Sequence, residues 1–212
     1  MEPSSECRPI VVLIHGLWMG RWAMWPLARR LKQAGFAPLL FGYPSRAAPA
    51  ANAERLAHWL DEQNASPDHF LAHSLGGVLL AHLFARHPDS RPPGARLVLL
   101  GSPLAGSAVA RGLAQWRLGR WLLGGSLEAG LAGDVPTWTA PNTLMLAGTR
   151  PVGPGRLVPE ALVSPNDGTV AVAETSTPGL TDHRCLPVNH FALLWSERVA
   201  QAAIDHLSSG GE

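Results

Sequence analysis

The sequence of 212 residues is 46% hydrophobic and 16% charged, which is typical of one globular domain and excludes a disordered chain. Its formal net charge of +1 argues against a nucleic-acid-binding protein, because such proteins concentrate basic residues on one face. The two cysteines, Cys7 and Cys185, are too few for a disulfide framework or a zinc site, and we expect Cys185 to be an interior free thiol.

The amino-terminal residues, MEPSSECRPI, do not combine a basic segment with a following apolar run, as a secretory signal does. No apolar stretch approaches the roughly 20 residues that span a membrane. We therefore expect a cytoplasmic protein.

Short apolar runs alternate with longer helix-like segments from residue 10 onward. The run before His15-Gly16 predicts a buried strand at 10–14, and apolar residues at helical spacing predict a helix over 22–34. Further strands are predicted at 38–41, 70–73, 97–100, 143–147 and 184–188, and further helices at 50–63, 75–86 and 192–207. This alternation predicts a single α/β domain over residues 1–212, with a mostly parallel sheet of about six strands and helices on both faces.

Residues 102–140 interrupt the alternation with many glycines and three tryptophans. We interpret this segment as a cap or lid of short helices over a functional site, the alternative being one crossover helix with loops. Its arginines are interleaved with apolar residues, and we favour a solvated outer face over contact with a lipid surface. These arginines are Arg111, Arg117 and Arg120.

Ser74 stands between the strand predicted at 70–73 and the helix that follows it. The carboxyl ends of strands are where α/β sheets place their chemistry, and a nucleophile there needs a very tight turn between small residues. Ala72 and Gly76 supply them. The amide of Leu75 would then lie at a helix N-terminus, where it could stabilise a negative oxygen. A serine that only caps the helix is the alternative for this motif alone.

A second amide donor is expected from the loop after the first strand, where His15-Gly16 precedes Leu17. The Leu17 amide is the candidate, since Gly16 allows a close approach of the main chain. The residues that follow include Trp18, Met19 and Trp22, which we expect to line an apolar pocket for an acyl chain. We assign Trp25, by contrast, to the helix core.

Asp167 and His190 complete the candidate site. Asp167-Gly168 is first of all a turn signal, but an acid on a turn after a late strand is suited to orient a histidine. His190 precedes the terminal helix, so it is expected near the same edge of the sheet as Ser74. The chain order of serine, acid and histidine is the order expected of an alpha/beta-hydrolase.

The segment AHSLGG at 72–77 resembles the nucleophile elbow of the alpha/beta-hydrolase superfamily and is similar to that of the small bacterial triacylglycerol lipases. HFALLWS at 190–196 resembles their histidine segment, and His15-Gly16 resembles their oxyanion loop. GSPLAGS at 101–107 and NDGTV at 166–170 resemble patterns in bacterial esterase/lipase-like hydrolases. The resemblance implies the alpha/beta-hydrolase fold and a serine esterase, although the minimal lipases lack a covering segment as long as residues 102–140.

These residues predict hydrolysis of a small-molecule ester with an apolar acyl group, without cofactor or metal. A thioesterase, amidase or acyltransferase with the same three side chains is the chemical alternative. A non-catalytic ligand- or partner-binding protein on this scaffold is the alternative from another class. Dinucleotide binding is disfavoured, because no Gly-x-Gly-x-x-Gly follows the first strand.

Overall fold

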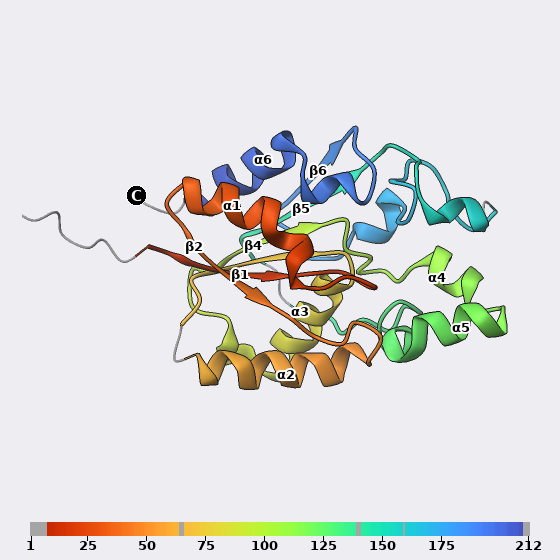
Figure 1. Ribbon diagram of the computed structural model, residues 1–212, viewed down its shortest axis with the longest axis horizontal. Helices are drawn as coiled ribbons and strands as arrows, with labels where there is room; N and C mark the ends of the chain where they lie inside the picture. Colours follow the sequence, from red (N-terminus) through yellow and green to blue (C-terminus); the bar gives the residue numbers. More distant parts are fainter. Residues whose placement is uncertain (1–7, 64–65, 139–140, 159, 210–212) are drawn as a thin grey trace, which may run out of the picture.

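The computed structural model describes residues 8–63, 66–138, 141–158 and 160–209. Within these residues, six parallel strands form one sheet in the order β2-β1-β3-β4-β5-β6 (Figure 1). The strands are β1 Ile10–Ile14, β2 Ala37–Phe41, β3 His69–His73, β4 Arg96–Leu100, β5 Thr143–Gly148 and β6 Asp182–Leu186. The predicted α/β architecture, with a parallel sheet and helices on both faces, is confirmed.

Two pairs of helices cover the two faces of the sheet (Figure 1). One face is covered by α1 (Trp25–Gln33) and α6 (Glu197–Ser208), and the other by α2 (Pro49–Glu62) and α3 (Leu75–Arg86). Alternate residues of each strand point to opposite cores, as Leu13 and Ile14 of β1 do. The central strands β1, β3, β4 and β5 are almost entirely buried, because both of their faces are covered, whereas the apolar edge strand β2 is only partly buried.

The strand order places a topological switch point between β1 and β3. From β1 the chain moves outward to β2, and it then returns across β1 to form β3 and continues in the opposite direction. Loops at such a point diverge and leave a crevice beyond the carboxyl ends of the strands. His15-Gly16 and Ser74 follow β1 and β3 directly, so both border this crevice.

Two of the predicted helices are divided in the structure. The first begins as a 3-10 turn, η1 (Arg21–Met24), and Pro26 lies in the first turn of α1, where its missing N–H costs no intrahelical hydrogen bond. The last is split into η6 (Ala192–Leu194) and α6, because Ser196 has extended backbone between them. Other 3-10 helices in the described part of the chain are η2 Pro88–Ser90, η4 Pro154–Leu157 and η5 Val172–Thr175.

Two expectations about buried side chains are wrong. Cys185 is exposed, because it lies on β6, an edge strand whose residues are only partly covered. Trp25 is 69% exposed, because α1 turns Leu27 and Leu31 toward the sheet and leaves its first residue outside. Cys7 lies outside the described residues.

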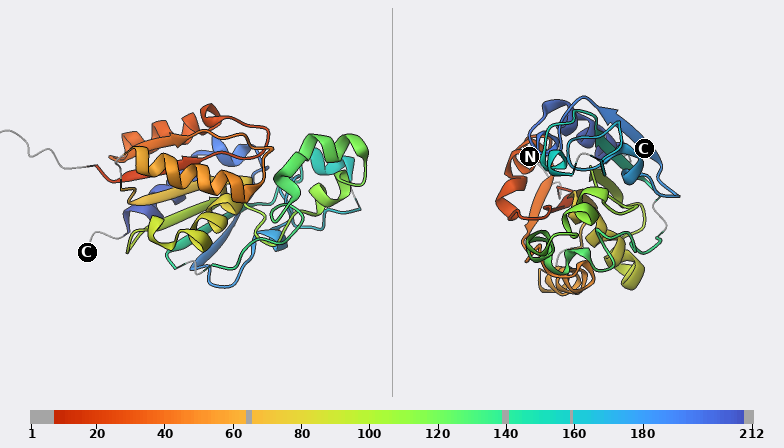
Figure 2. Two further views of the ribbon diagram at one scale, coloured as in Figure 1. Left: turned by 90° about the horizontal axis from the view of Figure 1, so that it is seen from below. Right: turned by 90° about the vertical axis from the view of Figure 1, so that its right-hand side faces the viewer.

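Residues 102–138, here called the cap segment, contain α4 (Ala108–Leu113), α5 (Arg117–Leu123) and η3 (Gly124–Leu127). They extend beyond the sheet at one end of the molecule (Figure 2). Val109, Leu113 and Leu123 pack with Leu75 and Val78 of α3 in a third apolar cluster. Residues 139–140, which close the predicted cap, lie outside the described residues. Among the described helices, none combines the length and the apolar character that crossing a bilayer requires.

Candidate active site

Ser74 occupies a tight turn between β3 and α3, with φ of 53° and ψ of −121°. Residues other than glycine rarely adopt this backbone conformation. In Ser74 the conformation holds the hydroxyl beyond the end of the strand. The turn also presses Gly76 against β1. A Cβ atom at Gly76 would lie 2.7 Å from the carbonyl oxygen of Ile14 and 2.9 Å from that of His15, so only glycine fits.

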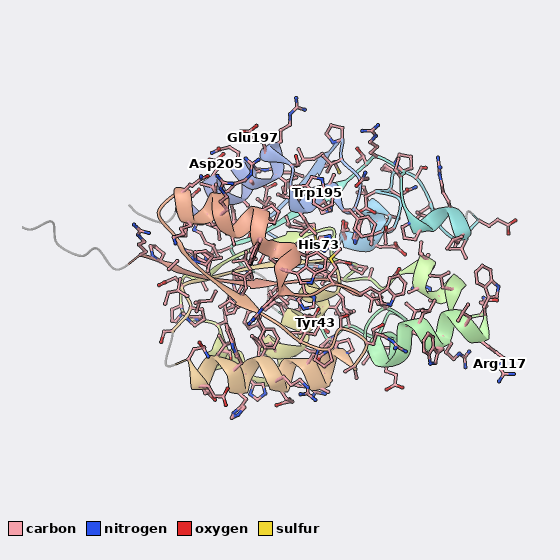
Figure 3. The ribbon with its side chains drawn as sticks, in the orientation of Figure 1. Tyr43, His73, Arg117, Trp195, Glu197 and Asp205 are labelled. Atoms are coloured by element: carbon pink, nitrogen blue, oxygen red, sulfur yellow. The ribbon has the colours of Figure 1, made fainter. Side chains whose placement is uncertain are left out.

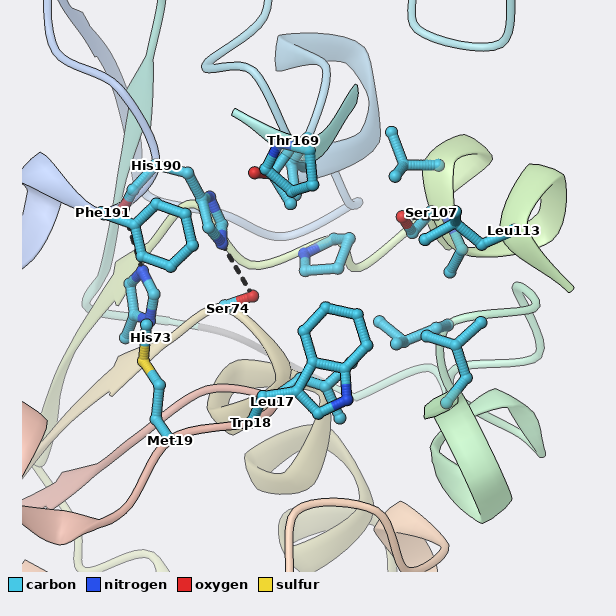
Figure 4. Close-up of a pocket in the computed structure, with 17 residues that line it drawn as sticks. Leu17, Trp18, Met19, His73, Ser74, Ser107, Leu113, Thr169, His190 and Phe191 are labelled. Carbon is cyan, nitrogen blue, oxygen red and sulfur yellow. Dashed lines mark hydrogen bonds between the residues drawn. The ribbon is translucent and has the colours of Figure 1, made fainter. Parts of the chain in front are cut away.

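The structure brings the side chains of Ser74, His190 and Asp167 together. Nε2 of His190 is 2.9 Å from Oγ of Ser74, and Nδ1 of His190 is 2.6 Å from Oδ2 of Asp167 (Figure 4). Because a carboxylate only accepts hydrogen bonds, Nδ1 carries the proton and Nε2 is left to accept one from the serine. All three residues are buried, with exposed fractions of 8%, 3% and 1%.

The second oxygen of Asp167 is fixed by the turn on which the residue lies. Oδ1 accepts hydrogen bonds from the main-chain amides of Thr169 at 2.9 Å and Val170 at 2.7 Å. The carbonyl oxygen of Asp167 accepts another from the amide of His190 at 2.9 Å. The Asp-Gly turn and the contact with histidine are therefore two aspects of one arrangement, which fixes the carboxylate before any substrate binds.

The loop after β1 lies directly against Ser74. A Cβ atom at Gly16 would be 3.0 Å from Cβ of Ser74. Within the described part of the chain, the amide of Leu17 donates to no protein acceptor. Leu75 is the first residue of α3, where main-chain amides lack intrahelical partners. The main-chain N–H groups of Leu17 and Leu75 thus border Ser74, and neither has an acceptor among the residues that the structure describes.

An apolar pocket opens beside Ser74 and lies between the sheet and the cap segment (Figure 4). It contains about 590 Å³ of empty space, including its open mouth. Trp18 and Met19 are among its lining residues, but Trp22 is not; it is 68% exposed on η1. The other lining residues are Leu17, His73, Ser74, Pro103, Ser107, Val109, Ala110, Leu113, Leu123, Leu131, Pro154, Thr169, Val170, His190 and Phe191.

The sequence matches the model of the alpha/beta hydrolase family over residues 11–206. The chain belongs to the alpha/beta hydrolase family. None of the curated proteins matches this sequence significantly.

Solved structures of several hydrolases resemble this alpha/beta hydrolase over nearly its full length. The mature lipase of Bacillus licheniformis is 20% identical, with a TM-score of 0.71 over 96% of this chain and 95% of that one. The monoacylglycerol lipase of Paleococcus ferrophilus is 17% identical, with a TM-score of 0.65 over 96% of each chain. A thioesterase from the prodiginine biosynthetic pathway of Streptomyces coelicolor is 19% identical, with a TM-score of 0.62 over 95% of this chain and 85% of that one. At these identities the likeness concerns the fold alone.

Two residues that the sequence analysis missed do not line the pocket of this hydrolase, but they hold the segments that do. Tyr43, labelled in Figure 3, stacks on the ring of His15 with centroids 4.3 Å apart. Its hydroxyl donates to the carbonyl oxygen of His15 at 2.7 Å. These contacts fix the loop that carries Gly16 and Leu17. An aromatic residue two positions after a strand is too common a pattern to single out from sequence.

The second missed residue is Glu174, which lies on η5, shortly after Asp167, and is 8% exposed. Its carboxylate accepts hydrogen bonds from the amides of Ala171, at 2.8 Å, and Ala108. Arg111 Nη2 lies 3.9 Å away. Burial raises the pKa of Glu174, and the hydrogen bonds and Arg111 oppose that effect. The residue thus links the segment that carries the acid to the first turn of α4.

Proposed function

We propose that the protein hydrolyses carboxylic esters through a covalent acyl-serine intermediate. The observation that carries this proposal is the chain of contacts from Asp167 through His190 to Ser74 at the end of an apolar pocket. A binding protein on the same scaffold would have no need for a buried base aligned between a hydroxyl and a carboxylate. The family and the fold of its lipase-like neighbours agree with this chemistry.

In the first half of the reaction, Oγ of Ser74 attacks the ester carbonyl while Nε2 of His190 takes its proton. The amides of Leu17 and Leu75 donate hydrogen bonds to the oxygen that becomes negative. The intermediate then collapses: the bond to the alcohol oxygen breaks, and His190 returns the proton to the departing alcohol. Asp167 holds the imidazole in one tautomer and stabilises its charged form.

The second half repeats these roles with water. His190 removes a proton from a water molecule as the water oxygen attacks the acyl carbonyl, and it then returns that proton to Ser74 as the acid leaves. Every proton and electron pair is accounted for by the ester, water and these side chains. The reaction therefore requires no redox partner.

The pocket suits an apolar acyl group. The wall that the cap segment forms is mostly aliphatic and includes Val109, Leu113 and Leu131. Trp18 and Met19, which follow Gly16 and Leu17 in the loop after β1, also line the pocket (Figure 4). The indole N–H of Trp18 donates to the carbonyl oxygen of Leu122 in the cap segment at 3.0 Å. Burial of a hydrocarbon chain against these residues would contribute about 0.8 kcal/mol per CH₂ group.

Covalent labelling separates this enzyme from a binding protein. A fluorophosphonate should label the wild-type protein and fail to label Ser74→Ala. Ser102→Ala is the matched control, because Ser102 is another buried serine whose hydroxyl has no hydrogen-bond partner in the described structure. Labelling of Ser74→Ala, or absence of labelling in the folded wild-type protein, would contradict the proposal.

Substrate class is tested with nitrophenyl esters of graded acyl length, the matching acyl thioesters and emulsified triglyceride. Ester hydrolysis at higher kcat/KM than thioester hydrolysis supports an esterase. The opposite preference would mean that the protein is a thioesterase with the same three side chains. One of the structural neighbours is a thioesterase. Preference for short acyl chains without activation by emulsion would distinguish an esterase from a true lipase.

A further inference from the structure

His73 is the last residue of β3 and directly precedes Ser74, yet the reaction described above does not use it. Its side chain is fully buried, and its ring centroid lies 4.7 Å from that of His190. Nε2 of His73 is 3.1 Å from the main-chain carbonyl oxygen of His190 (Figure 4). A single side chain thus joins the nucleophile turn to the histidine loop, which are 117 residues apart in sequence.

The contact fixes the protonation of His73. A carbonyl oxygen can only accept, so Nε2 of His73 must carry a proton. Nδ1 has no hydrogen-bond partner in the described structure, and it faces the main chain at Gly16, where a Cβ atom would be only 2.9 Å away. A proton on Nδ1 would be buried without an acceptor. Burial holds the pKa of His73 well below its ordinary value, and the neighbouring His190 lowers the pKa further. The ring is therefore a neutral donor.

The main chain of His190 is held from two sides. Its N–H donates to the carbonyl oxygen of Asp167 at 2.9 Å, and its carbonyl oxygen accepts from His73. The first contact sets His190 relative to the acid, and the second sets it relative to the serine. Proton transfer needs both contacts, because the distance between His190 Nε2 and Ser74 Oγ decides whether His190 can take the proton of the hydroxyl.

We propose that His73 is a positioning residue, whose Nε2–H fixes the main chain of His190 and thereby the distance between His190 Nε2 and Ser74 Oγ. This role rests on the proposed function of the site. Because His73 stays neutral, it can hold His190 throughout the reaction without repelling the imidazolium that forms 4.7 Å away.

Two amide variants test the role, because each imitates one nitrogen of the ring. Glutamine places its amide nitrogen near the position of Nε2 and can still donate to the carbonyl of His190. Asparagine places its amide near Nδ1 and cannot reach that carbonyl. We expect His73→Asn to lower kcat about 100-fold with KM changed less than about threefold, and His73→Gln to stay within about threefold of wild type in kcat.

The measurements are kcat and KM for a nitrophenyl ester, with thermal unfolding of each variant as the control for folding. Equal loss of kcat in both variants of an active enzyme, or no loss in either, would overturn the role of His73 alone. Absence of turnover and labelling in the wild-type protein would overturn the proposed function as well. If the asparagine variant does not fold, nitrogen NMR of the wild-type ring decides: a proton on Nε2 supports the contact, and a proton on Nδ1 rejects it.

Discussion

Glu174 accepts a hydrogen bond from the amide of Ala108, the residue at which α4 of the cap segment begins. Its other carboxylate oxygen accepts from Ala171, and its main-chain carbonyl accepts from Ala105 at 3.0 Å. Two of these hydrogen bonds, from Ala105 and Ala108, tie the cap segment to the segment that carries Asp167, and the one from Ala171 fixes the carboxylate within that segment. The position of the pocket wall and the position of the acid depend on the same side chain.

Replacement of Glu174 by alanine should destabilise the fold. Two amides would lose their acceptor in a buried place, and each unsatisfied group costs about 1–3 kcal/mol. Urea unfolding should show a loss of that order, whereas Glu128→Ala, at an exposed site in the same cap segment, should change stability by less than about 0.5 kcal/mol. Equal stability of the two variants would show that Glu174 is dispensable for holding α4.

The pH dependence of stability should carry the signature of Glu174. Because burial raises its pKa in the fold, its contribution is greatest below the ordinary value of 4.5 and is lost as pH rises through the raised value. Glu174→Gln cannot ionise. The free energy of unfolding of the wild type minus that of this variant should therefore fall with rising pH above about 4.5. Urea unfolding across that interval measures it, and a rising difference would reverse the assignment.

Asp167→Asn should lower kcat by about 10⁴ while the protein remains folded. The amides of Thr169 and Val170 require an oxygen at the Oδ1 position, so the new amide group would turn its nitrogen toward His190. His190 would then keep its proton on Nε2, the wrong nitrogen for a base. Asp89→Asn is the control, since Asp89 is exposed on η2 and does not line the pocket. Near-full activity of Asp167→Asn would direct the search to Asp182 or Asp134.

Gly101→Ala should separate crowding at the site from backbone strain. Gly101 has φ of +56°, and a Cβ there would lie 3.1 Å from Oδ2 of Asp167 and 3.2 Å from Nδ1 of His190. Gly35 also has positive φ, +95°, but a Cβ there would meet nothing within 4 Å. Both alanine variants should lose about 1–2 kcal/mol of stability.

Only Gly101→Ala should also lose activity, by about tenfold or more in kcat, because it displaces the Asp167–His190 pair. Stopped assays at equal concentrations of folded protein compare the two variants. Full activity in Gly101→Ala would mean that the pair can shift without consequence for the reaction.

The central strands could be predicted from sequence because they are buried on both faces and read as uninterrupted apolar runs. β1 matches the predicted strand at 10–14 throughout. β6 was predicted at 184–188 but spans Asp182–Leu186, because an edge strand with partly exposed, polar residues offers no apolar run to mark its ends. The helix at 192–207 was predicted as continuous, since apolar spacing does not reveal the extended backbone at Ser196.

The proximity of Ser74, Asp167 and His190 could be predicted from sequence, because each of them follows a strand at the same edge of a parallel sheet. The supporting residues could not. Tyr43 and Glu174 act on main-chain groups of His15 and of the cap segment, and no spacing in the sequence pairs a side chain with a distant amide or carbonyl. For the same reason the sequence indicates only that His73 ends a strand, and not that it contacts the carbonyl oxygen of His190.

The backbone at Ser74, with φ of 53°, is one that glycine enters easily and serine does not. Directed evolution of this protein would therefore give opposite results at one position, depending on what is selected. A library sorted for heat tolerance alone should enrich glycine at residue 74, whereas a library sorted for ester turnover should retain serine without exception. At residue 74, therefore, the amino acid that favours thermal stability differs from the one that ester turnover requires.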